Sequence, residues 1–233
     1  MSARSLNVSV VIPTYNSEAT LDRCLKSVLA QGQHVREILV IDGGSTDATL
    51  LCARAYGLVR VIDDRHYSLT QAWNAGVQAA SGDWIGFLDS DDWWSSDALR
   101  SHASAISAAS ARLGTAVRAI TGSVEYLLEG PEPPRGFRKE LLGSAHVGWM
   151  PGTTLVYRSV ARAVGEFREE FGVVSDIDWL ERLRRSQHVE LNSNVVLFKT
   201  VRASSVSMMR AQPTLGASEY SRELLAMLRR RIR

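Results

Sequence analysis

The first half of the chain alternates between two hydrophobic patterns, and this alternation limits the folds that are open to it. Residues 8–12 (VSVVI) are rich in β-branched side chains, as is typical of a strand buried on both faces. We expect Asn16 or Ser17 to cap a helix that ends at Gly32. The apolar residues of this segment have the spacing of one helical face: Leu21, Cys24, Leu25, Val28 and Leu29.

The alternation continues to the end of the fourth predicted strand and then becomes less regular. Three further strands are predicted at 37–42, 58–63 and 83–89, separated by helices at 43–57 and 68–82. Beyond about residue 111 the pattern predicts strands at 120–130, 153–159 and 194–201, with a helix at 174–186. Because strands separated by helices form βαβ units, we predict an α/β fold in one domain. Its central sheet is mostly parallel and flanked by helices, and its second half is mixed.

Composition excludes several classes of protein. The chain has 233 residues, of which 45% are hydrophobic, and a formal charge of +2, too small to argue for a nucleic-acid partner. No stretch approaches the roughly 20 apolar residues of a membrane span, and no targeting segment is recognisable. Cys24 and Cys52 lack a metal-type spacing, so we expect small buried hydrophobes in a reducing compartment, and hence a soluble cytoplasmic protein.

Polar residues follow three of the predicted strands. Asp42 ends one strand, Asp89 ends another, and Tyr15 and Asn16 follow the first. Ligands of open α/β sheets bind beyond the carboxyl ends of the strands, so we expect these side chains to converge on one ligand.

The segment IGFLDSDDWW (85–94) places three carboxylates within four positions: Asp89, Asp91 and Asp92. Carboxylates are hard oxygen ligands, and Mg²⁺ or Mn²⁺ is typically held by one or two of them together with substrate phosphates. Two other interpretations remain open from the residues alone. The run could cap a helix that begins near Asp97, or it could be a solvated loop.

Four segments in order resemble the motifs of family 2 glycosyltransferases with the GT-A fold. They are VSVVIPTYNSEATLDRCLKSVLAQ (8–31), EILVIDGGSTDATL (37–50), AWNAGVQAASGDWIGFLDSDDWW (72–94) and VGEFREEFGVVSDIDWLERL (164–183). The resemblance implies an inverting, metal-assisted transfer of a sugar from a nucleotide-diphosphate sugar to a hydroxyl acceptor, such as a glycan or a lipid-linked saccharide. It divides the domain into a nucleotide-sugar-binding half (1–111), an acceptor half (112–210) and a basic C-terminal helix (211–233).

The resemblance also implies how the nucleotide is bound. Pro13, Thr14 and Tyr15 match the segment that lines the nucleobase and ribose, and Asp42 matches the aspartate that hydrogen-bonds the base. Gly43 stands where the family more usually has a second aspartate.

The same resemblance assigns the cation site. Asp89 and Asp91 match the D-x-D motif, Asp91 as the direct ligand of Mn²⁺ or Mg²⁺ and Asp89 as a contact to the ribose or the metal. Trp73 stands where the family often has an arginine. Of the two late cations, Lys199 and Arg202, we assign Arg202 to the diphosphate.

The catalytic base implied by the resemblance is Asp176, in a segment where the family usually has a glutamate at the position of Ser175. We interpret Asp178 as a first-turn carboxylate that complements the helix dipole, and the same role stays open for Asp176. Trp149 is the candidate for stacking on the acceptor. Of the pair Trp93 and Trp94, we expect at least one to pack beneath the next helix.

The basic tail RELLAMLRRRIR has two interpretations: a helix packed on the domain, or a peripheral contact with the inner face of an anionic membrane. Other functions are disfavoured. PTYNSEAT lacks the glycines and basic residue that a nucleotidyltransferase needs, and no G-x-G-x-x-G indicates a dehydrogenase. The replacements at Ser175 and Trp73 leave open a catalytically inactive sugar-nucleotide binder or assembly partner of the same fold.

Overall fold

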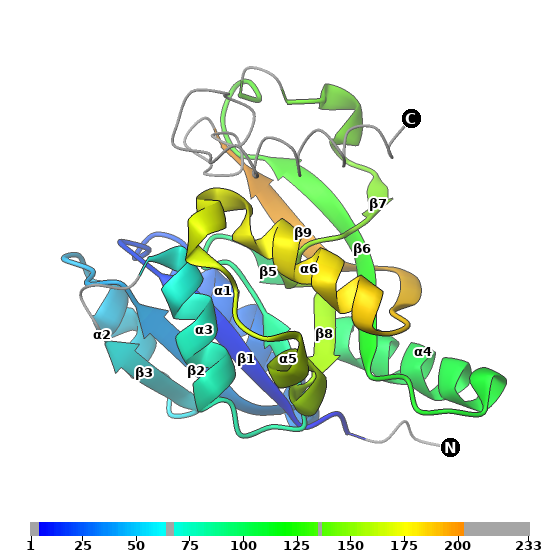
Figure 1. Cartoon of the computed structure of the whole chain (residues 1–233). Helices are drawn as coiled ribbons and strands as arrows, with labels where there is room; N and C mark the ends of the chain where they lie inside the picture. Colours follow the sequence, from blue (N-terminus) through cyan, green and yellow to red (C-terminus); the bar gives the residue numbers. More distant parts are fainter. Residues whose placement is uncertain (1–4, 64–67, 135–136, 203–233) are drawn as a thin grey trace.

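The computed structural model describes residues 5–63, 68–134 and 137–202. One mixed sheet runs through this part of the chain, with helices on both faces (Figure 1). Its strand order is β3-β2-β1-β4-β8-β6-β9-β5, and β7 pairs with β6 outside this path. The predicted fold class is confirmed.

The first half of the sheet is parallel. The strands β1 and β2 pair side by side, β3 extends the sheet beyond β2, and β4 lies on the other side of β1. The bounds of this half are β1 (Val8–Thr14), α1 (Leu21–Leu29), β2 (Val35–Asp42), α2 (Thr49–Arg54), β3 (Val59–Asp63), α3 (Leu69–Ala79) and β4 (Trp84–Phe87). All four strands therefore direct their carboxyl ends to one edge.

The second half is mixed. The strand β8 is antiparallel to both β4 and β6, whereas β9 runs parallel to β6 and antiparallel to the short β5. The pattern did not predict β5, which carries the two tryptophans. The bounds are β5 (Trp93–Trp94), α4 (Ala98–Leu113), β6 (Ala119–Leu128), β7 (Ala145–Val147), β8 (Thr154–Tyr157), α5 (Arg158–Val164), α6 (Ser175–Ser186) and β9 (Glu190–Val201). Short 3₁₀ turns occur at Gly32–His34, Lys139–Leu141, Pro151–Thr153 and Glu169–Val174.

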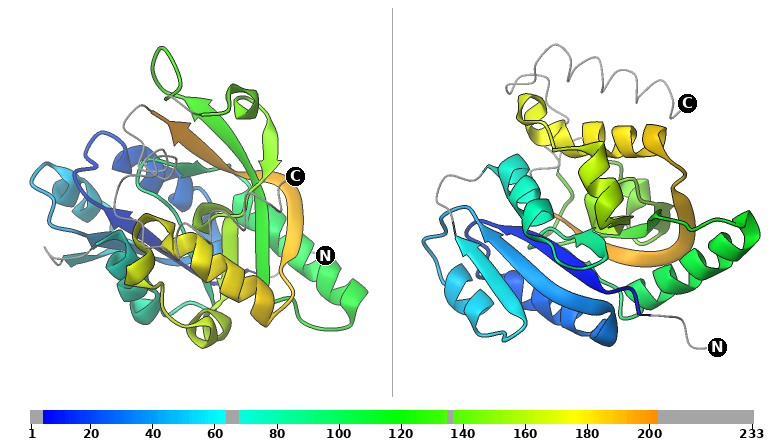
Figure 2. Two further views of the ribbon diagram at one scale, coloured as in Figure 1. Left: turned by 45° about the horizontal axis from the view of Figure 1, so that its top comes forward. Right: turned by 60° about the horizontal axis from the view of Figure 1, so that its bottom comes forward.

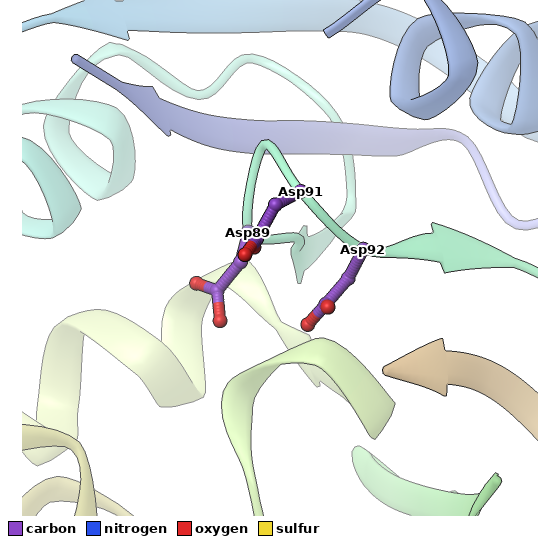
Figure 3. Close-up of side chains that lie close together, drawn as sticks. All are labelled: Asp89, Asp91 and Asp92. Carbon is purple, nitrogen blue, oxygen red and sulfur yellow. The ribbon is translucent and has the colours of Figure 1, made fainter. Parts of the chain in front are cut away.

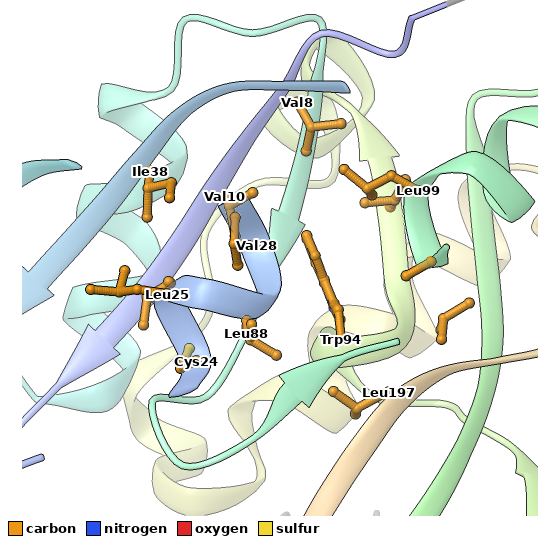
Figure 4. Packing of buried hydrophobic residues seen from close by; sticks show 14 of the residues in the cluster. Val8, Val10, Cys24, Leu25, Val28, Ile38, Leu88, Trp94, Leu99 and Leu197 are labelled. Carbon is orange, nitrogen blue, oxygen red and sulfur yellow. The ribbon is translucent and has the colours of Figure 1, made fainter. Parts of the chain in front are cut away.

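The core has two layers because alternate residues of a strand face opposite sides of the sheet. On one face, Val8 and Val10 of β1 pack with α1 and α4, and Trp94 of β5 closes this layer (Figure 4). On the other face, Val11 of β1 packs with Trp73 of α3 and Trp179 of α6. Figure 2 shows α3, α5 and α6 together on this second face. On the first face, α1 contacts the acidic segment through Arg23 and Cys24. On the second face, α6 packs on Phe87 at the end of β4.

The predicted N-cap of the first helix was wrong. Neither Asn16 nor Ser17 is the N-cap residue: α1 begins at Leu21 after Thr20, and its entry turn is closed by backbone bonds from Thr20 and Leu21 to the Ser17 carbonyl. Asn16 has a positive φ of 46° and binds the next loop instead. Both cysteines are free thiols; Cys24 is buried and Cys52 is half-buried at the margin of the core.

Within the described residues, none of the helices combines the length and the apolar character that crossing a bilayer requires. The predicted basic helix at 211–233 lies outside the described residues.

Candidate active site

The carboxyl end of β2 is shaped by Asp42, whose side chain is fully buried. Its Oδ2 accepts hydrogen bonds from the backbone amides of Gly44 and Ser45, at 2.9 and 2.7 Å. Its Oδ1 accepts from the hydroxyls of Thr14 (3.0 Å) and Ser45 (2.6 Å). Asp42 therefore fixes the turn after β2 and ties it to β1, and its contact with a nucleobase stays a prediction.

The loop after β1 and the turn after β2 are joined at the same edge. The Asn16 amide donates to the Ser45 hydroxyl, and the Asn16 side-chain oxygen accepts from the Thr46 amide at 2.9 Å. Between these anchors the ring of Tyr15 is 65% exposed, whereas Pro13 and Thr14 are buried in the end of β1. Of the three residues predicted to line the nucleotide, Tyr15 presents its side chain to solvent.

The turn after β4 brings together the three predicted carboxylates (Figure 3). Ligand oxygens of Asp89, Asp91 and Asp92 all lie within 4.8 Å of one another. Their environments differ, because the side chains of Asp89 and Asp91 are 44% and 35% exposed while that of Asp92 is 2% exposed. A set of hard oxygen donors at this spacing fits a divalent cation such as Mg²⁺ or Mn²⁺.

Two antiparallel strands bring a cation into this turn. Trp93 and Trp94 of β5 pair with Phe198 and Leu197 of β9. Continued by one residue, this register sets Asp92 opposite Lys199. The Lys199 ammonium lies 2.6 Å from Asp92 Oδ2 and 3.0 Å from Asp89 Oδ2.

The next residue of β9 completes the link. The Thr200 amide donates to Asp92 Oδ1 at 2.9 Å, and the Thr200 hydroxyl donates to the Asp91 carbonyl at 2.8 Å. The acidic turn is therefore held by β9 as well as by β4.

Charges and burial shift the pKa values of these groups. Burial raises the pKa of Asp92, and the Lys199 ammonium opposes this rise. Burial would lower the pKa of Lys199, but the carboxylates of Asp92, Asp89 and Asp91 outweigh it and raise that pKa. Burial, followed by the charge of Asp89, also raises the pKa of Asp91. Because the Lys199 ammonium lies 2.6 Å from Asp92 Oδ2, we describe Lys199 and Asp92 as an ion pair.

Arg202 lies at the solvent side of the same turn. Its Nη1 is 3.8 Å from Asp91 Oδ2, and its Nε donates to Glu129 at 2.5 Å. Glu129 also accepts a hydrogen bond from Arg23, at 3.1 Å. The Arg23 guanidinium stacks on the Trp93 ring, 3.9 Å from its centroid. The residue assigned to the diphosphate is thus adjacent to the D-x-D motif.

The helix α6 is anchored at this edge by its first turn and its core face. The Ser175 hydroxyl is 3.0 Å from that of Thr70, in the first turn of α3, which begins at the carboxyl edge of the sheet. Trp179 packs edge-on against Phe87, the last residue of β4, at a centroid distance of 5.7 Å. These contacts join α6 to the first turn of α3 and to the end of β4, the strand that leads into the acidic turn. Asp176 is 7% exposed, and its Oδ1 accepts from the Ile177 amide at 2.9 Å.

Asp178 has different surroundings from Asp176. It is 5% exposed and forms ion pairs with Arg182, at 2.9 Å, and Arg168, at 3.7 Å. Arg182 in turn donates to the carbonyls of Val164 and Glu166. Asp178 therefore connects α6 to the segment after α5, a more specific role than the predicted interaction with the helix dipole.

The remaining aromatic candidates divide into core and surface. Trp73 is buried between Phe87 and Phe167, so the position of the family arginine holds a core ring here. Trp94 is buried and donates to the Gly152 carbonyl at 2.9 Å, as expected for a packing residue. Trp149 is 38% exposed, with the Arg184 guanidinium of α6 at 4.4 Å from its ring centroid.

The sequence did not lead us to predict that Lys199 binds Asp89 and Asp92, nor that Arg23 and Glu129 form an ion pair beside the acidic turn, here called the clamp. A signal for Lys199 was present: a lysine inside the apolar run NVVLFKTV must be paired if the strand is buried. The clamp had no comparable signal, because Arg23 and Glu129 are 106 residues apart and each is an ordinary charged residue locally.

The family model "Glycosyl transferase family 2" matches residues 9–164, more than half of the chain. "Uncharacterized glycosyltransferase EpsJ" of Bacillus subtilis is 37% identical over 93 residues, which make up 38% of this chain and 27% of that protein. "Succinoglycan biosynthesis protein ExoO" of Rhizobium meliloti is 43% identical over 97 residues, 40% of this chain and 28% of that protein. The matched segment thus spans less than a third of either relative.

Solved structures show the same fold. The S. aureus TarS 1-349 structure in complex with UDP-GlcNAc has a TM-score of 0.68 at 21% identity, covering 93% of this chain and 69% of that one. The mannosyltransferase PcManGT from Pyrobaculum calidifontis, in complex with GDP-Man and Mn²⁺, has a TM-score of 0.62 at 20% identity, covering 88% of this chain and 59% of that one. These likenesses confirm the predicted GT-A-type fold.

Proposed function

Because the chain belongs to glycosyl transferase family 2, we propose that it transfers a sugar from a nucleotide-diphosphate sugar to an acceptor hydroxyl, with inversion at the anomeric carbon. The observation that carries this proposal is that α6, which bears Asp176, packs on the end of β4, the strand that leads into the acidic turn. Ser175 bound to Thr70 and Trp179 packed on Phe87 support it. Relatives named as glycosyltransferases agree with the same activity.

In the proposed reaction, Asp176 accepts the proton of the acceptor hydroxyl as a general base. A new bond forms between that oxygen and the anomeric carbon while the bond from this carbon to the phosphate oxygen breaks. The nucleoside diphosphate leaves with the electron pair of the broken bond. A single displacement needs one basic carboxylate, which fits the assignment of Asp178 to ion pairs with Arg182 and Arg168.

The donor is proposed to lie between the strand ends and the acidic turn. Asp89 and Asp91 would hold Mn²⁺ or Mg²⁺, which when bound neutralises the charge of the leaving diphosphate. Arg202 adds a positive charge beside Asp91. Pro13, Thr14, the exposed ring of Tyr15 and the turn fixed by Asp42 form the proposed nucleotide side.

The acceptor side is proposed to include Trp149, whose exposed ring offers an apolar face to a sugar. We propose a glycan or a lipid-linked saccharide as acceptor, in keeping with the name of the relative ExoO. The proposed location is the cytoplasm, and the two interpretations of the basic tail, a helix packed on the domain or a peripheral contact with the inner face of the membrane, stay open.

A thermal-shift screen tests the proposal. UDP-, GDP- and dTDP-sugars are compared with and without Mn²⁺, for the wild-type protein and for Asp91→Ala. We expect one nucleotide to raise the melting temperature only with Mn²⁺ and only in the wild type. Stabilisation that is unchanged in Asp91→Ala would overturn the cation site. Donor binding without release of nucleoside diphosphate, with a range of saccharide acceptors present, would favour the inactive binder.

A further inference from the structure

The Lys199 ammonium lies among the same carboxylates that are grouped tightly enough to hold a metal ion. It bonds Asp92 at 2.6 Å and Asp89 at 3.0 Å, and its side chain is only 14% exposed. A buried lysine requires such partners, because an unpaired ammonium is costly to remove from water. The chain therefore supplies its own cation to this cluster.

The two bonds of Lys199 differ in their surroundings. Asp92 is 2% exposed, and its second oxygen accepts from the Thr200 amide, so its carboxylate is enclosed by β9. The side chain of Asp89 is 44% exposed and borders solvent. Exposed ion pairs exchange their partners at little cost, whereas enclosed pairs do not. The bond to Asp89 is the one that an incoming cation can replace.

We propose that Lys199 is an internal counter-ion that remains bound to Asp92 and competes with a divalent cation for Asp89. This inference rests on the proposed function, because it takes Asp89 and Asp91 as the ligands of the cation. It divides the acidic turn into two exposed ligands and one buried anchor. Before the cation arrives, Lys199 limits the repulsion between the carboxylates and keeps the turn in place.

The charges of the cluster allow a matched test. Three carboxylates and one ammonium give a net charge of −2 in the wild type. The double variant Asp92→Asn with Lys199→Met also has −2, since it loses one charge of each sign. It keeps Asp89 and Asp91, and the asparagine oxygen can still accept from Thr200. A change in cation affinity in this variant therefore reports the loss of competition and not a change of net charge.

The experiment titrates each protein with Mn²⁺ in the absence of nucleotide and measures free Mn²⁺ by electron paramagnetic resonance. We expect the double variant to bind Mn²⁺ about tenfold more tightly than the wild type, the equivalent of one lost bond to a charged group. Equal Mn²⁺ affinities of the wild type and the double variant would overturn the competition. If the double variant then also bound UDP more weakly in EDTA, Lys199 would be assigned to the diphosphate instead.

Two controls separate this inference from the proposed function. Asp91→Ala should lose Mn²⁺ binding; if the wild type and the double variant bind Mn²⁺ and Asp91→Ala does so equally, the cation site of the proposed function is wrong. Thermal melts check the fold. Lys199→Met alone should be the least stable protein, because it leaves Asp92 buried without its cation, and the added Asp92→Asn should restore stability. A melting temperature of Lys199→Met equal to that of the wild type would overturn the enclosed ion pair.

Discussion

The turn after β4 and the first turn of α6 both carry closely spaced aspartates, and in both regions one of these aspartates is bound by basic side chains. In each, one aspartate is enclosed by basic side chains: Asp92 by Lys199, and Asp178 by Arg182 and Arg168. Their neighbours are Asp91, whose side chain is 35% exposed and lies 3.8 Å from Arg202, and Asp176, the proposed general base. The enclosed aspartates hold elements together, and their neighbours are the candidates for chemistry.

The two regions also differ. The acidic turn is fixed by long-range partners on β9, which is more than 100 residues away along the chain. The turn of α6 is stabilised within a short stretch, since Arg182 lies four residues after Asp178. In both regions, the aspartate that is bound by a nearby basic side chain joins separate segments of the fold.

The largest expected effect tests the division within α6. Asp176→Asn removes the proposed base and should lower kcat by about a thousandfold, while donor affinity stays unchanged. Release of nucleoside diphosphate in the presence of acceptor measures kcat, and calorimetric titration measures donor binding. The matched control Asp178→Asn should lose about 2 kcal/mol of stability and keep kcat within about threefold. Equal loss of kcat in both variants would remove the distinction between the two residues.

A second variant tests the division within the acidic turn. Asp92→Ala leaves Lys199 enclosed without its closest partner, and we expect the free energy of unfolding to fall by about 3 kcal/mol. Asp89→Ala removes a partly exposed carboxylate and should change it by less than about 1 kcal/mol. Urea unfolding followed by circular dichroism gives both values. Similar losses of unfolding free energy in the two variants would show that Lys199 binds Asp89 and Asp92 equally.

A buried histidine extends the comparison to a group that is kept neutral. His102 of α4 is 2% exposed, and burial lowers its pKa from 6.5 to about 4. Between these pH values the unfolded chain binds a proton that the folded protein does not. The contribution of neutral His102 to the free energy of unfolding is therefore fully present above pH 6.5. The free energy of unfolding should fall by about 3 kcal/mol as the pH is lowered to 4. Urea unfolding across this range measures the decline, which His102→Gln should reduce; an unchanged slope would contradict the assignment.

The smallest effect concerns the exposed ring near α6. Trp149→Ala removes an apolar face at the proposed acceptor side, so KM for the acceptor should rise about fivefold with donor affinity unchanged. Arg184→Ala leaves the ring and removes the guanidinium that covers part of it. Initial rates at varied acceptor concentration measure KM. Unchanged KM in Trp149→Ala would place the acceptor elsewhere.

Much of the architecture was predictable because its signals are local. The β-branched run at 8–12 and the helical spacing from Leu21 to Leu29 depend on neighbouring residues only, and both elements were found. The placement of Asp42 and Asp89 at the carboxyl ends of parallel strands also followed, since β2 and β4 both pair in parallel with β1. The caps of α1 and the strand β5 were missed, because their backbone bonds depend on distant segments.

The candidate site was predictable as a set of residues but not as a division of roles. The sequence by itself determined that carboxylates follow buried strands and that a lysine lies inside an apolar run. Only the tertiary structure decided that β9 returns beside β5 and sets Lys199 opposite Asp92. The physical reason is that strand pairing joins segments through backbone hydrogen bonds, which carry no residue-specific signal. The charge that each aspartate meets is therefore fixed only when the chain has folded.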